Sequence, residues 1–173
     1  MAYLDPVAGA RREAGSGVIG ATDIEDASVS RTDLTAAAAR KHIQVVSASI
    51  ATTSNTDNYV IVPETGTLDS VDFSSLAALA AHDSNYITWT ITNLGQAGSG
   101  NTAMLAATDA NTTKATGGTA LSANTKRSLT LHGTAANLAV TAGDRLLIRA
   151  AATGTLAGAV TVPVYLLRFA GTT

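Results

Sequence analysis

The chain contains no cysteine, only three prolines and few aromatic residues. Without cysteine it can form neither a disulfide framework nor a thiolate metal site, so its stability has to come from packing and association. Aromatic residues make up 4% of the 173 positions and Trp89 is the single tryptophan, which limits how much each buried side chain stabilises the core. We therefore expect contacts between copies of the chain to add to its stability.

Charge is scarce after the first 41 residues. The whole chain has 11 basic and 13 acidic residues, and the segment 1–41 contains five of the basic and six of the acidic ones. The remainder has to stay in solution through Thr, Ser, Asn and Gly, a surface typical of an assembled or exposed particle. With a net charge of −2 and no basic stripe interleaved with aromatics, the sequence predicts no nucleic-acid partner.

Long apolar runs are also missing. The first residues, MAYLDPVAGARREAGSG, lack the continuous apolar stretch of a signal peptide, and no run of about 18 apolar residues follows. We expect a soluble protein that is made in the cytoplasm and has no membrane partner.

From Val46 onward the sequence shows the two-residue period of β-strands. The clearest case is 86–92, where Ile87, Trp89 and Ile91 share one face and the intervening residues share the other. Further strands are predicted at 46–51, 59–62, 70–73, 102–107, 128–132, 146–148 and 160–167, with a turn-rich surface connection over 109–126. The apolar segment 76–81 could form a single helical turn.

The even spacing of about eight strands predicts an all-β domain, either a sandwich or a barrel. We favour a jelly-roll-like antiparallel β-sandwich over residues 42–173. The preceding segment, 1–41, is predicted to be an extended N-terminal arm that serves attachment, because its glycines do not favour independent folding. A short helix is predicted near 33–41, with Thr32 or Asp33 as its N-cap and Arg40 and Lys41 at its C-terminal end.

Motifs for catalysis and ligand binding are weak. Residues 15–20 match GxGxxG, but no strand pattern precedes them, so we interpret them as a hinge. The three histidines, His42, His82 and His132, lack metal-binding spacing. The pairs Asp69 with Asp72 and Asp57 with Glu64 are interpreted as solvating acids on wet strand faces and turns. The sequence predicts no catalytic residue, no metal site and no cofactor, and hence no enzyme.

Three segments of the domain resemble a known family: VPETGTLDSVDF at 62–73, YITWTITNLG at 86–95 and VTAGDRLLIR at 140–149. They are similar to the jelly-roll decoration, or cement, proteins and head fibres of tailed bacteriophages. ATDIEDASVSRTDL, at 21–34 of the arm, is similar to connectors of trimeric phage fibres.

This resemblance implies a homotrimer seated on the capsid exterior, made in the host cytoplasm, with the major capsid protein as partner. The protein would stabilise the capsid by bridging neighbouring capsid subunits, and the arm would lie across them. Candidate docking residues in the arm are Tyr3, Leu4, Arg11, Arg12, Val18, Ile19 and Ile24. The alternative is a receptor- or carbohydrate-binding tip domain of a tail fibre, which would need exposed aromatic side chains.

Overall fold

A computed structural model describes residues 41–171, which form an all-β domain. Its strands are β1 (Lys41–Val46), β2 (Thr56–Ile61), β3 (Gly66–Ser74), β4 (Tyr86–Asn93), β5 (Thr102–Ala103), β6 (Arg127–Leu129), β7 (Ala139–Val140), β8 (Arg145–Thr153) and β9 (Val164–Gly171). Two very short helices occur among the described residues: the 3₁₀-helix η2 (Asp109–Asn111) and α1 (Ala135–Leu138). The all-β prediction is confirmed.

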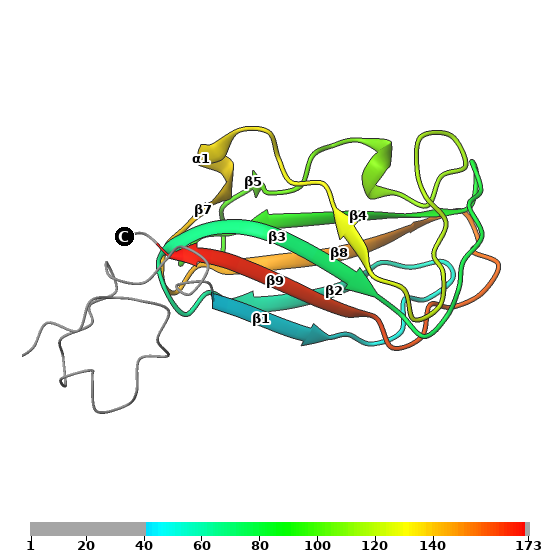
Figure 1. The fold of residues 1–173 in the computed structure, drawn as a ribbon, viewed down its shortest axis with the longest axis horizontal. Coiled ribbons are helices and arrows are strands. Elements are labelled where there is room, and N and C mark those ends of the chain that lie inside the picture. The colour runs from blue at the N-terminus through cyan, green and yellow to red at the C-terminus, as the bar shows by residue number, and fades with distance from the viewer. Residues whose placement is uncertain (1–40, 172–173) are drawn as a thin grey trace, which may run out of the picture. The chain divides into compact units, whose positions relative to one another are not determined.

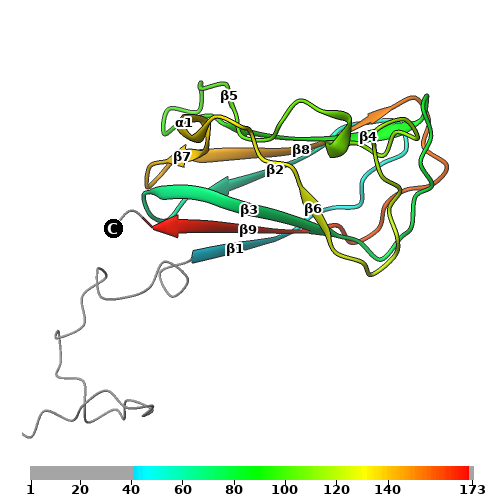
Figure 2. The same cartoon turned by 45° about the horizontal axis from the view of Figure 1, so that its top comes forward.

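The strands form two antiparallel sheets that lie face to face (Figures 1 and 2). One sheet, called sheet A here, has the order β1-β9-β3-β6, and the short β7 also pairs with β3. The other, called sheet C, has the order β2-β8-β4-β5. The strands β1 and β2 are therefore edge strands of different sheets, as are β6 and β5.

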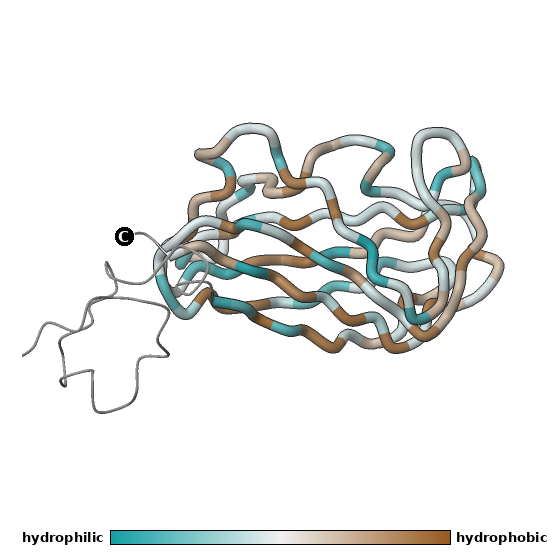
Figure 3. Tube along the Cα trace, in the orientation of Figure 1, coloured by the Kyte–Doolittle hydropathy of each residue, from teal (hydrophilic) through white to brown (hydrophobic). Residues whose placement is uncertain are grey.

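Apolar and polar residues alternate along the strands (Figure 3), and the buried apolar ones form the core between the sheets. At its centre the ring of Phe73, from β3, lies 5.0 Å from that of Trp89 on β4 and 5.2 Å from that of Tyr165 on β9. Tilted aromatic contacts of this kind stabilise a core beyond their buried area alone. The prediction for 86–92 is confirmed, since Ile87, Trp89 and Ile91 are all buried.

Two polar atoms are enclosed in this aromatic centre. The hydroxyl of Tyr165 and the indole nitrogen of Trp89 are buried, and the two side chains approach each other without the geometry of a hydrogen bond. Burial raises the pKa of the Tyr165 phenol, because the charged form is disfavoured away from water. The phenol therefore stays neutral and acts as a packing group.

A bulge in β3 explains why its inward residues do not follow a strict period of two. The pairing of β3 with β9 shifts between Leu68 and Ser70. The extra residue lets Leu68 and Val71, three positions apart, both face the core, where both are buried.

The first strand begins earlier than predicted. Lys41 is the first residue of β1, and it pairs with Phe169 in the register of the two strands. A helix over 33–41 therefore cannot include Lys41, and the rest of that predicted helix lies outside the described residues. The strand predicted over 46–51 is also wrong in extent: β1 ends at Val46, and beyond it Ile50 makes only an isolated bridge to Val160.

The last strand begins later than predicted, at Val164 instead of residue 160. Val162 has a positive φ of 46°, which breaks the strand between the Val160 bridge and β9. A β-branched residue rarely adopts this left-handed conformation, because its side chain crowds the backbone. No alternation of apolar residues encodes such a turn.

The segments between β3 and β4 and between β4 and β6 differ most from the predictions. The strand expected over 102–107 is limited to β5, and 76–81 forms no helix, since Leu79 instead bridges Leu121. The connection 109–126 is not a simple surface loop, because Asn111, Thr113 and Leu121 are buried.

Candidate docking surfaces

The residues predicted to dock all precede Lys41. Tyr3, Leu4, Arg11, Arg12, Val18, Ile19 and Ile24 lie outside the described residues, as does the GxGxxG match at 15–20. The surfaces considered below are those of the domain 41–171.

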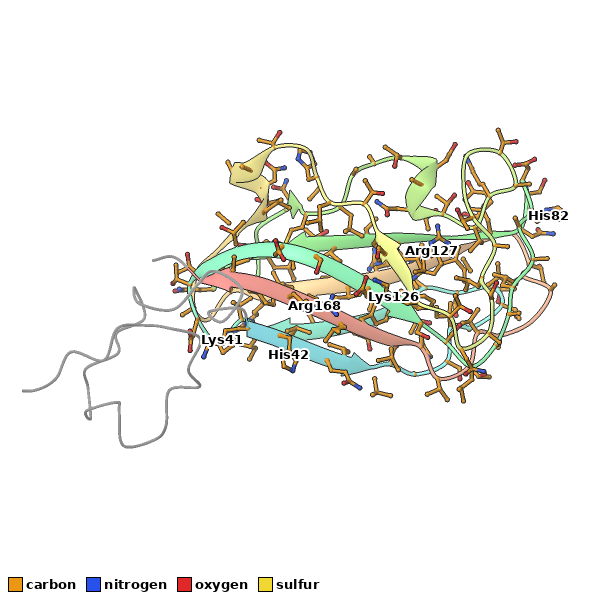
Figure 4. The ribbon with its side chains drawn as sticks, viewed as in Figure 1. Lys41, His42, His82, Lys126, Arg127 and Arg168 are labelled. Carbon is orange, nitrogen blue, oxygen red and sulfur yellow. The ribbon has the colours of Figure 1, made fainter. Side chains whose placement is uncertain are left out.

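An acidic residue at the centre of the outer face of sheet A is fully bonded. Arg168 donates to Asp72 Oδ2 at 2.6 Å and the Ser128 hydroxyl donates to Oδ1 at 2.7 Å. Lys126 Nζ lies 3.5 Å from Oδ1, and Arg168 also donates to the Ser70 hydroxyl at 3.3 Å. Lys126 and Arg168 are labelled over this face in Figure 4. The cluster joins β3, β6 and β9 through side chains.

The environment of Asp72 favours its charged form. Burial by itself raises the pKa of the carboxyl, but the hydrogen bonds from Arg168 and Ser128 and the charges of Lys126 and Arg168 outweigh burial, so the pKa lies below its ordinary value. The side chain is only 7% exposed, and the prediction of a solvating acid is wrong for Asp72. Because hydrogen bonds and an ion pair occupy both of its carboxylate oxygens, Asp72 serves to stabilise the sheet.

The acids Asp57 and Glu64, considered above as a pair, bind different bases. Arg149 donates to both carboxylate oxygens of Asp57 at 2.7 Å, linking β8 to β2, and Lys41 lies 3.3 Å from Glu64. The fork from Arg149 lowers the pKa of Asp57. The structure therefore places the two carboxylates in separate ion pairs.

The three histidines lie apart. His42 is exposed on β1, and Figure 4 labels it at the opposite end of the domain from His82. His82 Nδ1 accepts from the N–H groups of Ser84 and Asn85, and His132 Nδ1 accepts from the N–H of Thr134. Two of the three rings thus stabilise local turns. Among residues 41–171 no cluster of three metal-ligating side chains is found.

One buried amide holds the segment between β5 and β6. Asn111 donates to the carbonyls of Ala106 and Thr130 at 2.9 and 2.8 Å, and its oxygen accepts from the Thr130 N–H at 2.7 Å. These bonds extend the isolated bridge between Leu105 and Leu131, since the side chain takes the place of a neighbouring backbone.

Arg127 provides a second tie in the same region. Its guanidinium donates to the carbonyls of Ala110, Thr112 and Thr119, and it lies 4.7 Å from the centre of the Trp89 ring. Burial lowers the pKa of Arg127, although such a group stays protonated. The side chain connects the loop 109–119 to β6 and to the aromatic centre.

A groove lies where the segment 103–114 runs beside β4 of sheet C. Tyr86, Thr88 and Thr90 of β4 form its floor, and Asp109 and Lys114 form part of its wall. Lys114 Nζ lies 5.1 Å from the centre of the Tyr86 ring and 3.0 Å from Asp109. The ammonium group therefore already covers the ring that a sugar would stack on.

Large exposed apolar side chains form a patch at one end of sheet A, called the end patch here: Val46, Leu76 and Val162. Val46 lies opposite Val164 in the register of β1 and β9, and the Leu76 N–H donates to the Thr161 carbonyl at 3.1 Å. The strained backbone of Val162 holds one of these side chains in water. Strain of about 1–3 kcal/mol at an exposed site is typical of functional surfaces.

A second apolar surface lies on β2 and is called the edge patch here. Tyr59 and Ile61 are 66% and 68% exposed and project from the same face of sheet C. With Leu94, Gly98 and Arg145 they line a shallow hollow. Side chains of this size are seldom left in water together on the edge of a sheet.

Sequence reasoning missed both patches. The run 59–62 predicts a strand, yet periodicity alone does not distinguish an apolar residue that faces the core from one that faces solvent. The available signal was that Tyr59 and Ile61 share one face, while the buried Val60 and Val62 occupy the other.

No helix within the described residues is long and apolar enough to cross a membrane. Comparison with protein families, with curated proteins and with solved structures finds no match to this chain. The surfaces described above are therefore the basis for a functional conclusion.

Proposed function

We propose that this protein is a structural virion protein, which decorates a bacteriophage capsid and stabilises it by bridging neighbouring capsid subunits. The observation that carries the proposal is the end patch, an exposed apolar surface formed by Val46, Leu76 and Val162. Apolar side chains that a folded backbone holds in water favour contact with another protein surface. The major capsid protein is the proposed partner.

The strand order supports a jelly-roll fold, as the resemblance implies. The first strand, β1, pairs with the last, β9, and β2 pairs with β8 in the opposite sheet. The following strands β3 and β4 then lie beside β9 and β8. A chain folded back along its length in this way favours the double-sheet jelly roll that we propose, in which β7 would be a two-residue addition.

In the proposed mechanism the segment 1–41 and the domain contact different capsid subunits. Each contact on its own can be weak, because linked sites bind with a high effective concentration once one of them is engaged. A homotrimer multiplies the number of contacts further. The protein would thereby resist the separation of subunits that internal pressure favours.

The test is binding to capsids that have been assembled without the protein. We expect the full-length double variant Arg11→Glu/Arg12→Glu to lose at least about tenfold in affinity, if these charges pair with acids on the shell. Deletion of residues 1–40 should abolish binding. The cut has to leave Lys41 in place, because this residue begins β1 and pairs with Glu64.

Far-UV circular dichroism of both variants serves as the control for folding. A matched variant of the domain, Ser122→Glu, adds one exposed negative charge outside the segment 1–41 and should bind nearly as well as the unmodified chain. Equal capsid occupancy by the deletion variant would show that the arm does not dock.

A tail-fibre tip that binds a receptor or carbohydrate is the second candidate, and the groove beside Tyr86 is the observation in its favour. The contact of Lys114 with the ring counts against it, since a sugar would have to displace the ammonium group. A glycan array separates the two candidates. Binding to glycans that is lost in Tyr86→Ala, together with no binding to capsids, would favour the tip domain.

A further inference from the structure

The edge strands of the two sheets differ in how well they are protected from pairing with another chain. The edge strands β5 and β6 have only two and three residues, which leaves little backbone for another strand to pair with. The edge strand β1 begins with two residues that have basic side chains, Lys41 and His42. By contrast, β2 has six residues without a lysine or a proline. Its one charge, Asp57, is engaged by Arg149. Within the described residues, β2 thus has neither a bulge nor a proline, two of the devices that usually protect a strand edge.

The backbone of β2 also presents unpaired groups on its outer side. The Val62 N–H donates to the Asp144 carbonyl, and the Val62 carbonyl accepts from Gly143, so both groups of Val62 face the β8 side. The register with β8 is continuous from Thr56 to Ile61. Because successive residues of a strand direct these groups to opposite sides, those of Tyr59 and Ile61 point away from β8. No other strand among residues 41–171 pairs with this side.

The side chains of β2 are complementary to a second β2 in one antiparallel register. When Val60 lies opposite Val60 of a second copy, Tyr59 of each copy lies opposite Ile61 of the other. An aromatic residue opposite a β-branched one is a favourable cross-strand pair. Shifting the two-fold axis to Tyr59 would instead place Asp57 opposite Ile61, an acid against an apolar side chain. The apolar match therefore selects the register centred on Val60, in which residues 59–61 of the two strands overlap and Asp57 lies opposite Pro63, just beyond the end of β2.

We propose that β2 is a contact between two copies of this chain, which pair antiparallel across a two-fold axis at Val60. The contact extends sheet C from one copy into the next and covers the edge patch of both. A two-fold axis does not relate copies within a trimer, so in a trimeric assembly this contact links neighbouring trimers. The proposal rests on the geometry of β2 and does not require capsid binding.

The absence of native cysteine allows a direct test by single-cysteine crosslinking of the full-length chain. In the proposed register residue 60 faces its own copy as a non-hydrogen-bonded pair, with Cα atoms about 4.5 Å apart, a distance that a disulfide spans. Under mild oxidation Val60→Cys should form a covalent dimer at least about tenfold faster than Tyr59→Cys, since residue 59 lies opposite residue 61 instead of its own copy.

Leu76→Cys, at an exposed position on the other sheet, measures crosslinking by random collision. If Val60→Cys crosslinks no faster than Leu76→Cys, the proposal is wrong. If Tyr59→Cys is the faster variant, the register is wrong.

A second measurement avoids cysteine. Native mass spectrometry or sedimentation should show that the full-length chain associates through a contact that Tyr59→Lys weakens at least tenfold, while the matched variant Leu76→Lys leaves it unchanged. Equal association of both variants overturns the proposal. Loss of capsid occupancy in Tyr59→Lys with no change in association would also overturn it, because the edge would then bind a capsid subunit. Capsid occupancy and self-association are separate readouts, so either proposal can fail alone.

Discussion

The two long sides of the sandwich are built in different ways. On the side of β1 and β2, regular ladders of six residues lead to edges that are open as far as residues 41–171 are concerned. On the side of β5 and β6, the strands have two and three residues, and side chains such as Asn111 and Arg127 complete the backbone hydrogen bonding. One side is thus regular and open, and the other is irregular and closed.

This difference shows how edges can be protected. Where the chain crosses the sheet edge between residues 104 and 134, carbonyls that would attract another strand are bonded to buried side chains. The β2 edge has no such cover among the described residues, and it carries exposed apolar side chains. Because the β5 and β6 edges are covered and the β2 edge is not, another chain is expected to associate through β2.

The largest effect is expected from removing the buried amide on the closed side. Asn111→Ala leaves the Thr130 N–H without its partner and removes one of the two donors to each of the Ala106 and Thr130 carbonyls, which should lower the free energy of unfolding by about 1–3 kcal/mol. Asn58→Ala is the matched control on the open side, where the amide donates one hydrogen bond, to the Ser47 hydroxyl, within residues 41–171. Chemical denaturation measures both. A smaller loss for Asn111→Ala than for Asn58→Ala would break the comparison.

An intermediate loss of folding stability is expected at low pH. We expect Asp72, which bonds to β6 on the closed side, to account for more of this loss than Asp57 on the open side. The pKa values of Asp72 and Asp57 are both lowered from 3.8 in the fold. Their contribution to stability is therefore complete above this unfolded-state value and is lost as the pH falls through the folded values. Because Asp72 is nearly buried and Asp57 is about one-third exposed, Asp72→Asn should remove more of the acid-dependent loss than Asp57→Asn. Urea unfolding at pH 7, 4 and 3 measures this, and equal profiles for the two variants would contradict it.

The smallest effect on folding is expected at the open edge. Ile61→Thr keeps a β-branched residue on an exposed face, and it should change the free energy of unfolding by less than about 0.5 kcal/mol in dilute solution. The same variant should weaken self-association, since the edge patch loses one of its apolar members. A large loss of stability in the isolated chain would mean that Ile61 contributes to the fold and is not reserved for a contact.

The regular parts of the fold could be predicted from the sequence. The alternation in 86–92 identified β4 and its three buried residues, and Val71 and Phe73 identified the inward face of β3. The irregular parts could not. No pattern marks Asn111 as a buried residue that bridges two carbonyls, because its partners lie several residues away on either side.

The candidate surfaces show the same division. Tyr59, Ile61 and Val46 were recognisable as apolar strand residues, but only the packing of the two sheets decides that these residues face solvent while neighbours such as Val60 face the core. The sequence by itself determined the all-β class, most strand positions and the scarcity of charge in the domain, because local alternation and composition encode them. The tertiary structure alone decided which edges are open, which acid is buried and where the backbone is strained, because these depend on residues that are distant in the chain and meet only in the folded protein.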